Sequence, residues 1–133
     1  MRAGGQAVAF EPRVERCDRI ARNATLLGVP GLVIHRAKAP DALPRDGVSP
    51  DAIFVGGGIS EPGMLDACHR ALKAGGRLVA NAVTVEGEAA LTAFHARHGG
   101  DMTRLAIARL APTGGFHTWH AAMPITQYAG SKL

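Results

Sequence analysis

The sequence of 133 residues is poor in cysteine and in aromatic residues, and it contains no long apolar run. Cys17 and Cys68 lie on the inward faces of predicted helices, without the close Cys/His pairing of a structural zinc site, so we expect both to be reduced and buried. No apolar run approaches the roughly 18–20 residues of a membrane span. The first residues also lack the apolar core of a signal peptide, and these absences together predict a cytoplasmic protein.

Charge of one sign is not concentrated anywhere along the chain. Lys and Arg together number 15 against 11 Asp and Glu, which gives a net charge of +4 and a pI near 9.7. Because only 5% of the residues are aromatic and the basic residues are scattered, nucleic-acid binding is not supported. An anionic small molecule is an equally good partner for the basic excess.

Metal ligands are also sparse. His95 with His98, and His117 with His120, are each spaced closely enough to share a metal ion. A third ligand at suitable spacing is missing from both pairs, so we predict no metal site. The remaining composition, 47% hydrophobic and 20% charged, is that of an ordinary globular protein, and the length fits a single domain over residues 1–133.

The apolar pattern predicts alternating strands and helices up to Gly100. The predicted strands are Gln6–Phe10, Leu32–Ile34, Ala52–Val55 and Arg77–Val83. The predicted helices are Arg13–Leu27, with Val14, Cys17, Ala21 and Ala24 inward; a second helix with Ser60 as N-cap and Leu65, Cys68 and Leu72 inward; and Thr84–His98. This alternation predicts an α/β fold, with a parallel sheet covered by helices on both sides.

The pattern changes after Gly100. Two strand-like runs, Thr103–Leu110 and Ala122–Tyr128, follow without an intervening helix, and we expect the segment Pro112–His120 between them to be a loop. Two strands without a crossover helix are expected to be antiparallel neighbours. The predicted sheet therefore ends in an antiparallel strand pair.

The segment Asp51–Gly58 is a short apolar strand that ends on three glycines, Gly56, Gly57 and Gly58. Ligands of open α/β sheets bind at the carboxyl ends of the strands, and residues without a Cβ allow the backbone to approach a ligand closely. A tight strand-to-helix turn explains the same glycines without a ligand.

Glu11 closes the first predicted strand. An acid at this position in a nucleotide-binding fold accepts hydrogen bonds from ribose hydroxyls, about 20 residues after the Gly-rich turn of the preceding strand. Only ten residues come before Glu11, so we expect that turn to be missing from this chain and the chain to open at the tail of a helix. An exposed acid at a strand end is the alternative interpretation.

The order of these parts resembles a class I S-adenosylmethionine-dependent methyltransferase. The matching features are the acid Glu11, the segment Lys38-Ala39-Pro40 after the next strand, the three glycines, and the final antiparallel pair. More narrowly, four segments resemble the family of decarboxylating precorrin-6Y methyltransferases of cobalamin biosynthesis. These segments are Asp51–Gly58, Gly75–Thr84, Ala96–Gly100 and Ala122–Gln127, and the second is the most specific.

The resemblance implies a Rossmann-like class I methyltransferase sheet that is N-terminally incomplete, because the family's first strand and Gly-rich cofactor turn have no counterpart here. It implies transfer of a methyl group from S-adenosylmethionine to a precorrin tetrapyrrole, with decarboxylation of an acetate side chain. Such a transfer needs alignment rather than a protein nucleophile, so no catalytic residue is assigned.

The same resemblance implies roles for individual residues. Glu11 holds the ribose, the backbone at Lys38 and Ala39 meets the adenine, and the glycines 56–58 pass beneath the methionine part. Lys38 stands where the family can carry an acid. The residues that face the tetrapyrrole are Asn81, His117, Trp119 and His120, with Arg104 and Arg109 suited to its carboxylates.

Two other functions fit the pattern. A nicotinamide-dependent oxidoreductase also uses an acid to hold a ribose, and a non-catalytic module would need another chain to complete its sheet. Since unpaired strand edges are costly, we expect residues 1–133 alone to be poorly stable or homo-oligomeric. We also expect them to show no measurable binding of S-adenosylmethionine by calorimetry.

Overall fold

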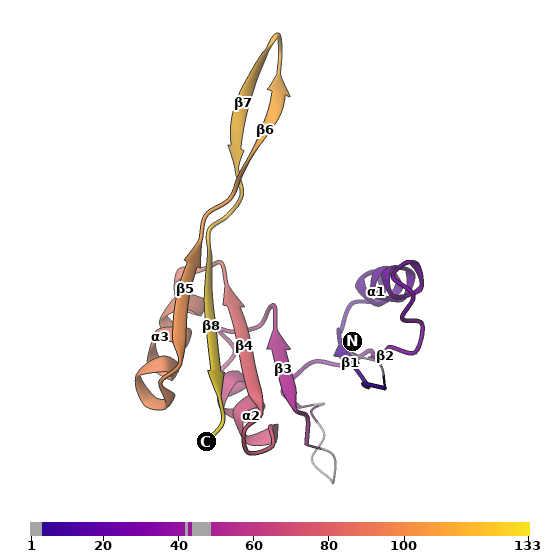
Figure 1. The fold of residues 1–133 in the computed structure, drawn as a ribbon, viewed down its shortest axis with the longest axis vertical. Coiled ribbons are helices and arrows are strands. Elements are labelled where there is room, and N and C mark those ends of the chain that lie inside the picture. The colour runs from indigo at the N-terminus through magenta and orange to yellow at the C-terminus, as the bar shows by residue number, and fades with distance from the viewer. Residues whose placement is uncertain (1–3, 42, 44–48) are drawn as a thin grey trace. The chain divides into compact units, whose positions relative to one another are not determined.

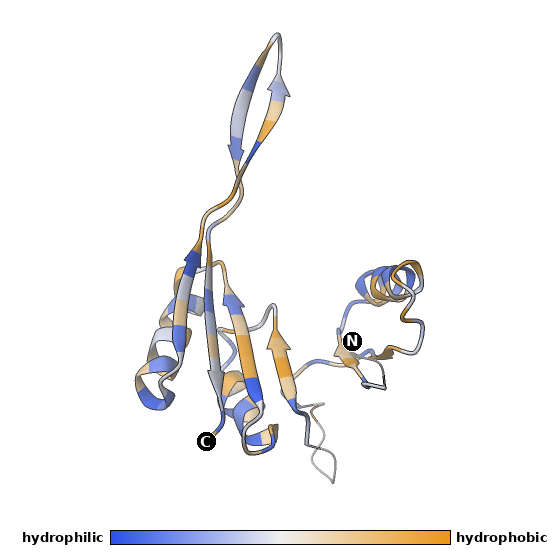
Figure 2. Cartoon of the chain, in the orientation of Figure 1, coloured by the Kyte–Doolittle hydropathy of each residue, from blue (hydrophilic) through white to orange (hydrophobic). Residues whose placement is uncertain are grey.

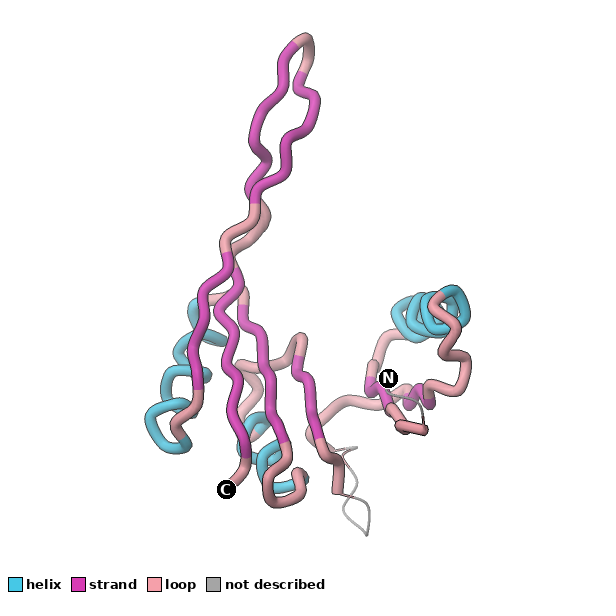
Figure 3. Tube along the Cα trace, viewed as in Figure 1, coloured by secondary structure: helices cyan, strands magenta, loops and turns pink. Residues whose placement is uncertain are grey.

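The computed structural model describes residues 4–41, 43 and 49–133, which fall into two compact units. The first unit is Met1–Leu43 and the second is Pro44–Leu133. Each unit is described by itself below, and Figures 1 and 3 show the elements of both. The expectation that residues 1–133 form one partial domain stays a prediction.

The first unit is a strand–helix–strand motif built from β1 (Val8–Phe10), α1 (Val14–Leu26) and β2 (Val33–His35). β1 and β2 pair in parallel with Val8 opposite Val33, as the alternation predicts. The helix ends at Leu26, and Gly28, two residues later, has a φ of 70°, the left-handed conformation typical of a helix stop.

The predicted inward face of α1 is only partly correct. Ala24 is buried, but Val14 and Ala21 are exposed and Cys17 is half-buried. The expectation that Cys17 is buried was therefore wrong. The predicted face of α1 consists mostly of short side chains. The two-stranded sheet of this unit offers only a narrow surface on which they can be buried.

The second unit contains a four-stranded sheet with the strand order β3-β4-β8-β5. These strands are Ala52–Val55, Arg77–Ala82, Ile125–Ser131 and Asp101–Leu105, respectively. β3 and β4 are parallel, whereas β8 runs antiparallel to both β4 and β5. The predicted antiparallel neighbours at the end of the chain are confirmed as β5 and β8.

Two helices of this unit, α2 (Met64–Ala71) and α3 (Val85–His98), contact each other through the rings of His69 and Phe94 and the ion pair of Asp66 with Arg97. The Thr84 hydroxyl caps α3 by accepting a hydrogen bond from the Gly87 N–H at 3.1 Å. The expectation that Ser60 caps α2 was wrong: the helix begins at Met64, after Gly63 in a left-handed conformation with φ 76°. Tight turns closed by the backbone of Glu61 delay the start of the helix beyond Pro62.

The core lies between these two helices and one face of the sheet. Its largest fully buried side chains are Tyr128, Phe94, Leu72, Leu78, Leu91 and Cys68. The rings of Phe94 and Tyr128 meet edge to face, with centroids 5.2 Å apart. Burial of each such side chain contributes about 1.5–3 kcal/mol. Leu65, Cys68 and Leu72 are buried as predicted for α2.

The expected loop Pro112–His120 is instead most of a β-hairpin. β6 (Ala108–Thr113) and β7 (Phe116–Ala121) pair as an antiparallel two-stranded sheet, joined by the turn Gly114–Gly115 with φ 60° at Gly114. We call residues 108–121 the arm. Figure 1 shows the arm as an extension beyond the ends of β5 and β8. Glycines at both central turn positions permit the tight connection that the loop prediction missed.

Candidate functional site

Two parallel strands bring the glycine segment and Asn81 to one edge of the larger sheet. Val55 lies opposite Ala80 in the register of β3 with β4, so Gly56 and Asn81 follow at the carboxyl ends of neighbouring strands. This is the edge at which open α/β sheets bind ligands. The roles that the resemblance implies for these residues stay a prediction.

The three glycines differ in what their backbone requires. Gly58 has a φ of 74°, which disfavours other residues, and a Cβ on Gly56 would lie 3.0 Å from the Phe54 ring. A Cβ on Gly57 would meet nothing within 4 Å. The turn explanation thus accounts for Gly58, while Gly57 borders open space in which another molecule can approach the backbone.

Asn81 has a cross-strand partner that the sequence did not reveal. The Gln127 side-chain N–H donates to the Asn81 side-chain oxygen at 2.9 Å, and the two residues lie opposite each other on β4 and β8. Both side chains are half-buried, on the sheet face opposite Ala80 and Ala82. The Asn81 side chain retains two N–H donors that this hydrogen bond does not use.

Glu88 on α3 joins two strands through its carboxylate. It accepts a hydrogen bond from the buried Thr126 hydroxyl on β8 at 3.2 Å and forms an ion pair with Arg104 on β5. Arg104, which the resemblance offers to substrate carboxylates, therefore already has an acidic partner. Its contact with a tetrapyrrole stays a prediction.

Glu11 lies at the corresponding edge of the first unit. Its backbone N–H donates to the His35 carbonyl at 3.1 Å, so the end of β1 and the chain leading to Lys38 and Ala39 share one edge. One carboxylate oxygen accepts the Arg13 N–H at 2.9 Å, and the Arg16 guanidinium is 3.7 Å from the other. A carboxylate has about four acceptor positions, so acceptor capacity for two ribose hydroxyls remains.

The remaining predicted residues lie on the arm. His117 and Trp119 share one face of β7, while His120 is on the opposite face and contacts Thr113 and Thr118 at 3.0 Å each. The arm and the four-stranded sheet are separate sheets, so none of these three residues pairs with β4, the strand of Asn81. Their contact with a substrate stays a prediction, as does the grouping of Glu11 with the glycines, since these belong to different units.

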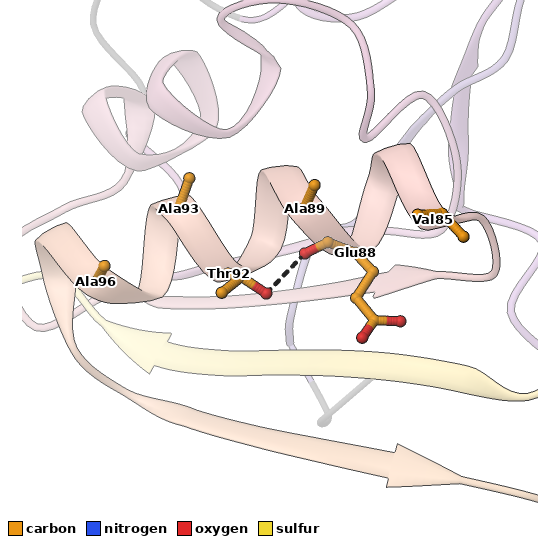
Figure 4. A pocket seen from close by; sticks show the side chains of 6 residues that line it. All are labelled: Val85, Glu88, Ala89, Thr92, Ala93 and Ala96. Atoms are coloured by element: carbon orange, nitrogen blue, oxygen red, sulfur yellow. Dashed lines mark hydrogen bonds between the residues drawn. The ribbon is translucent and has the colours of Figure 1, made fainter.

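A shallow cavity of about 520 Å³ lies on the outer face of α3 (Figure 4). It is lined by Val85, Glu88, Ala89, Thr92, Ala93 and Ala96. The Thr92 hydroxyl donates to the Glu88 carbonyl at 2.9 Å, so its polar group is satisfied within the helix. The cavity contains none of the predicted site residues.

Within residues 4–41, 43 and 49–133, no three His, Cys, Asp or Glu side chains are grouped in a way that holds a metal ion. The same part of the chain contains no helix that is both long and apolar enough to cross a membrane.

Comparison with known proteins identifies the family. The family of precorrin methyltransferase domains matches residues 1–132. The chain belongs to this family. It is 53% identical to the decarboxylating precorrin-6Y C(5,15)-methyltransferase of Sinorhizobium sp over 96% of its own length, but it spans only 30% of that relative.

Solved structures agree with the predicted fold. The C-terminal domain of precorrin-6Y C5,15-methyltransferase from Rhodobacter capsulatus superimposes with a TM-score of 0.84 at 41% identity, covering 97% of this chain and 70% of that one. A SAM-dependent O-methyltransferase from Thermotoga maritima shares the fold at 18% identity, with a TM-score of 0.66, over 96% of this chain and 50% of that one. The prediction of a class I methyltransferase α/β fold is confirmed.

Proposed function

We propose that this chain is a domain of an S-adenosylmethionine-dependent enzyme that methylates a precorrin and decarboxylates one of its acetate side chains. The observation that carries the proposal is the family match over residues 1–132, together with a relative of that activity at 53% identity. The chain's own geometry supports it, because Gly56–Gly58 and Asn81 occupy one carboxyl edge of the sheet.

The residues at the two edges fit the parts of the proposed cofactor. Glu11 retains acceptor positions for ribose hydroxyls, and the open space beside Gly57 admits a ligand against the backbone. Lys38 and Ala39 follow β2 at the edge that Glu11 shares, where we assign the adenine. When bound, S-adenosylmethionine supplies a methyl group activated by its sulfonium.

The protein's contribution to methyl transfer is positioning. The two free N–H donors of Asn81 suit a carboxylate of the tetrapyrrole, and Gln127 fixes their direction. We assign His117 and Trp119 to contact with the same substrate. No acid or base is assigned, since alignment and the local field lower the barrier for transfer from a sulfonium.

Glu11→Ala tests the cofactor assignment in the full protein. Loss of two charge-assisted hydrogen bonds, each worth about 1.5–3 kcal/mol, predicts at least a tenfold weaker affinity for S-adenosylmethionine by calorimetry. Glu15→Ala is the matched control, because this substitution removes the same charge from the exposed first turn of α1. Unchanged affinity in a folded Glu11→Ala protein would overturn the ribose assignment.

The assembly and the cellular location of the protein are also proposals. We propose a cytoplasmic homo-oligomer that binds neither nucleic acid nor membrane. Native mass measurement of the 133-residue chain, combined with calorimetry, tests whether this chain alone binds cofactor or needs another chain to do so. The nicotinamide alternative lacks support from the comparisons, since the family match is to methyltransferases.

A further inference from the structure

The two faces of the four-stranded sheet carry different side chains at its carboxyl edge. Side chains alternate between the faces of a strand, and the face against α2 and α3 carries the buried Thr126 and Tyr128. Asn81 and Gln127 lie opposite each other on the other face, which we call the far face. Arg104 pairs with Thr126 in the register, so its guanidinium lies on the helix side of the sheet and not beside Asn81.

The Asn81–Gln127 pair lies between two apolar rows of the far face. The members of these rows in the register are Val79 with Ala129 and Ile125 with Leu105. All of them are half-buried except Leu105, which is 38% exposed. Figure 2 shows the apolar character of β3 and of the middle of β4. The two amides are therefore polar groups with apolar neighbours on both sides.

Formal charges on the far face lie away from this pair. Arg77 is at the start of β4, about 13 Å from Asn81 at about 3.3 Å per residue. Asp101 is on β5, which β8 separates from β4. Among the described residues of these four strands, no charged side chain shares the far face with the pair at a neighbouring position.

The pair combines a fixed orientation with unused donors. The Gln127 N–H donates to the Asn81 oxygen at 2.9 Å, and the described part of the chain supplies no acceptor for the two Asn81 N–H groups. Half-buried donors without an acceptor favour the binding of an acceptor from another molecule. A carboxylate supplies about four acceptor positions and is suited to this place.

We propose that the Asn81–Gln127 pair holds the acetate carboxylate that the enzyme removes as CO2. This inference rests on the proposed function and deepens it, because it assigns residues to decarboxylation. Asn81 binds the carboxylate directly, and Gln127 is a positioning residue that acts through Asn81. The register brings Asn81 and Gly56 to neighbouring strand ends, so the carboxylate lies beside the place assigned to the methyl donor.

The two steps balance without an oxidant or a reductant. The methyl group reaches a ring carbon without an electron pair, and the conjugated ring gains one positive charge. The bond between the acetate methylene and the carboxyl carbon then breaks, its electron pair moves into the ring and cancels that charge, and CO2 leaves. The remaining methylene takes one proton from water while the ring gives one proton to water, so a methyl group is left in place of the acetate.

A neutral donor suits this bond cleavage better than a cation. The negative charge of the carboxylate disappears as the bond breaks, so a contact that is stronger before cleavage than during it raises the barrier. Hydrogen bonds from a charged donor are roughly twice as strong as those from a neutral donor. Two amides between apolar rows fix the direction of the carboxylate with little stabilisation of its charge, and the ion pair with Glu88 holds Arg104 on the other side of the sheet.

The masses of the products separate decarboxylation from methyl transfer. In the full protein, mass spectrometry counts product molecules that carry every methyl group of the wild-type product and retain the carboxyl group. Gln127→Glu replaces the donor with an acceptor, so the Asn81 N–H groups turn toward residue 127 and its oxygen faces the substrate. We expect decarboxylation to slow about tenfold or more relative to methyl transfer, and this retained-carboxyl product to accumulate.

Asn81→Lys tests the argument about charge. Its ammonium group is expected to bind the precorrin at least as tightly as wild type does, while decarboxylation slows about tenfold or more. Decarboxylation faster than that of wild type overturns the proposal. Thr103→Val is the matched control, because Thr103 lies opposite Gln127 on the far face and also loses one polar group. This control should keep the product ratio within about twofold of wild type.

The remaining outcomes distinguish this inference from the proposed function. Equal slowing of methyl transfer and decarboxylation in Gln127→Glu shows that the pair only binds substrate and overturns the proposal. A product ratio that changes equally in Gln127→Glu and Thr103→Val also overturns it. A wild-type protein that transfers no methyl group overturns the proposed function instead, and this inference with it. If Gln127→Glu does not fold by circular dichroism, Asn81→Lys decides.

Discussion

The four-stranded sheet and the arm are separate sheets that follow each other along the chain, and β8 of the first differs from β7 of the second in burial. β8 alternates between buried Thr126 and Tyr128 and half-buried neighbours, because α2 and α3 cover one of its faces. In the arm, where no described helix follows the strands, β7 is exposed at every position. Strand pairing alone therefore does not bury side chains, and a covering layer is required.

The largest expected difference between the two regions concerns an aromatic side chain. Phe94→Ala removes a fully buried ring from the sheet's core, and we expect the free energy of unfolding to fall by about 3–5 kcal/mol in urea titrations. Phe116→Ala, at the tip of the arm where the ring is 78% exposed, should change it by less than about 0.5 kcal/mol in dilute solution. Similar losses for both would contradict the comparison.

The next effect concerns the contact that ties the helix layer to the sheet. Glu88→Ala leaves the buried Thr126 hydroxyl without its acceptor and removes the ion pair with Arg104. We expect a loss of about 1–3 kcal/mol in unfolding free energy. Glu86→Ala, at an exposed position two residues earlier in the same helix, should cost little. Equal stability of the two variants would show that the carboxylate does not join the layers.

A smaller effect is expected at the start of α3. Thr84→Ala removes the hydroxyl that accepts the Gly87 N–H and should lower the unfolding free energy by about 1 kcal/mol. Thr84→Ser retains an oxygen at the same position and should restore most of it. Failure of serine to restore stability would point to the methyl group rather than the cap.

The smallest effect depends on pH. Burial lowers the pKa of His69 below its ordinary 6.5, and the electrostatic interactions with His98 and Lys132 lower it further. The Asp66 carboxylate acts in the opposite direction. The unfolded chain then binds the proton more readily, so stability is complete above pH 6.5 and is lost as the pH falls through 6.5 toward the folded pKa. Thermal melts of His69→Asn should lose this pH dependence, whereas His120→Asn, on the arm, should keep it. Identical pH profiles for wild type and His69→Asn would refute the assignment.

Much of the sheet could be predicted from the sequence because its strands are short apolar runs between glycines and helices. The positions of Glu11, the three glycines and Asn81 at strand ends followed directly from those runs. Gln127 was missed because its pairing with Asn81 joins residues 46 apart in sequence and depends on the register of β8 with β4.

The arm was missed for a different reason. Pro112 and the two glycines favour a loop, and they outweighed the signal of a two-residue Gly-Gly turn flanked by Thr113 and Phe116. The start of α2 was misplaced because Ser60 and Pro62 form a typical helix beginning, while the backbone turn around Glu61 is set by the conformation of Gly58. In both segments two local signals compete, and the residue types alone do not show which backbone turn forms.

Pro112 has a consequence for the free edge of the arm. Proline carries no backbone N–H, so the edge of β6 lacks a donor at this position. A further strand that pairs with this edge finds a hydrogen bond missing, which disfavours edge-to-edge growth. A single ring in one strand thus protects an exposed hairpin against open-ended aggregation.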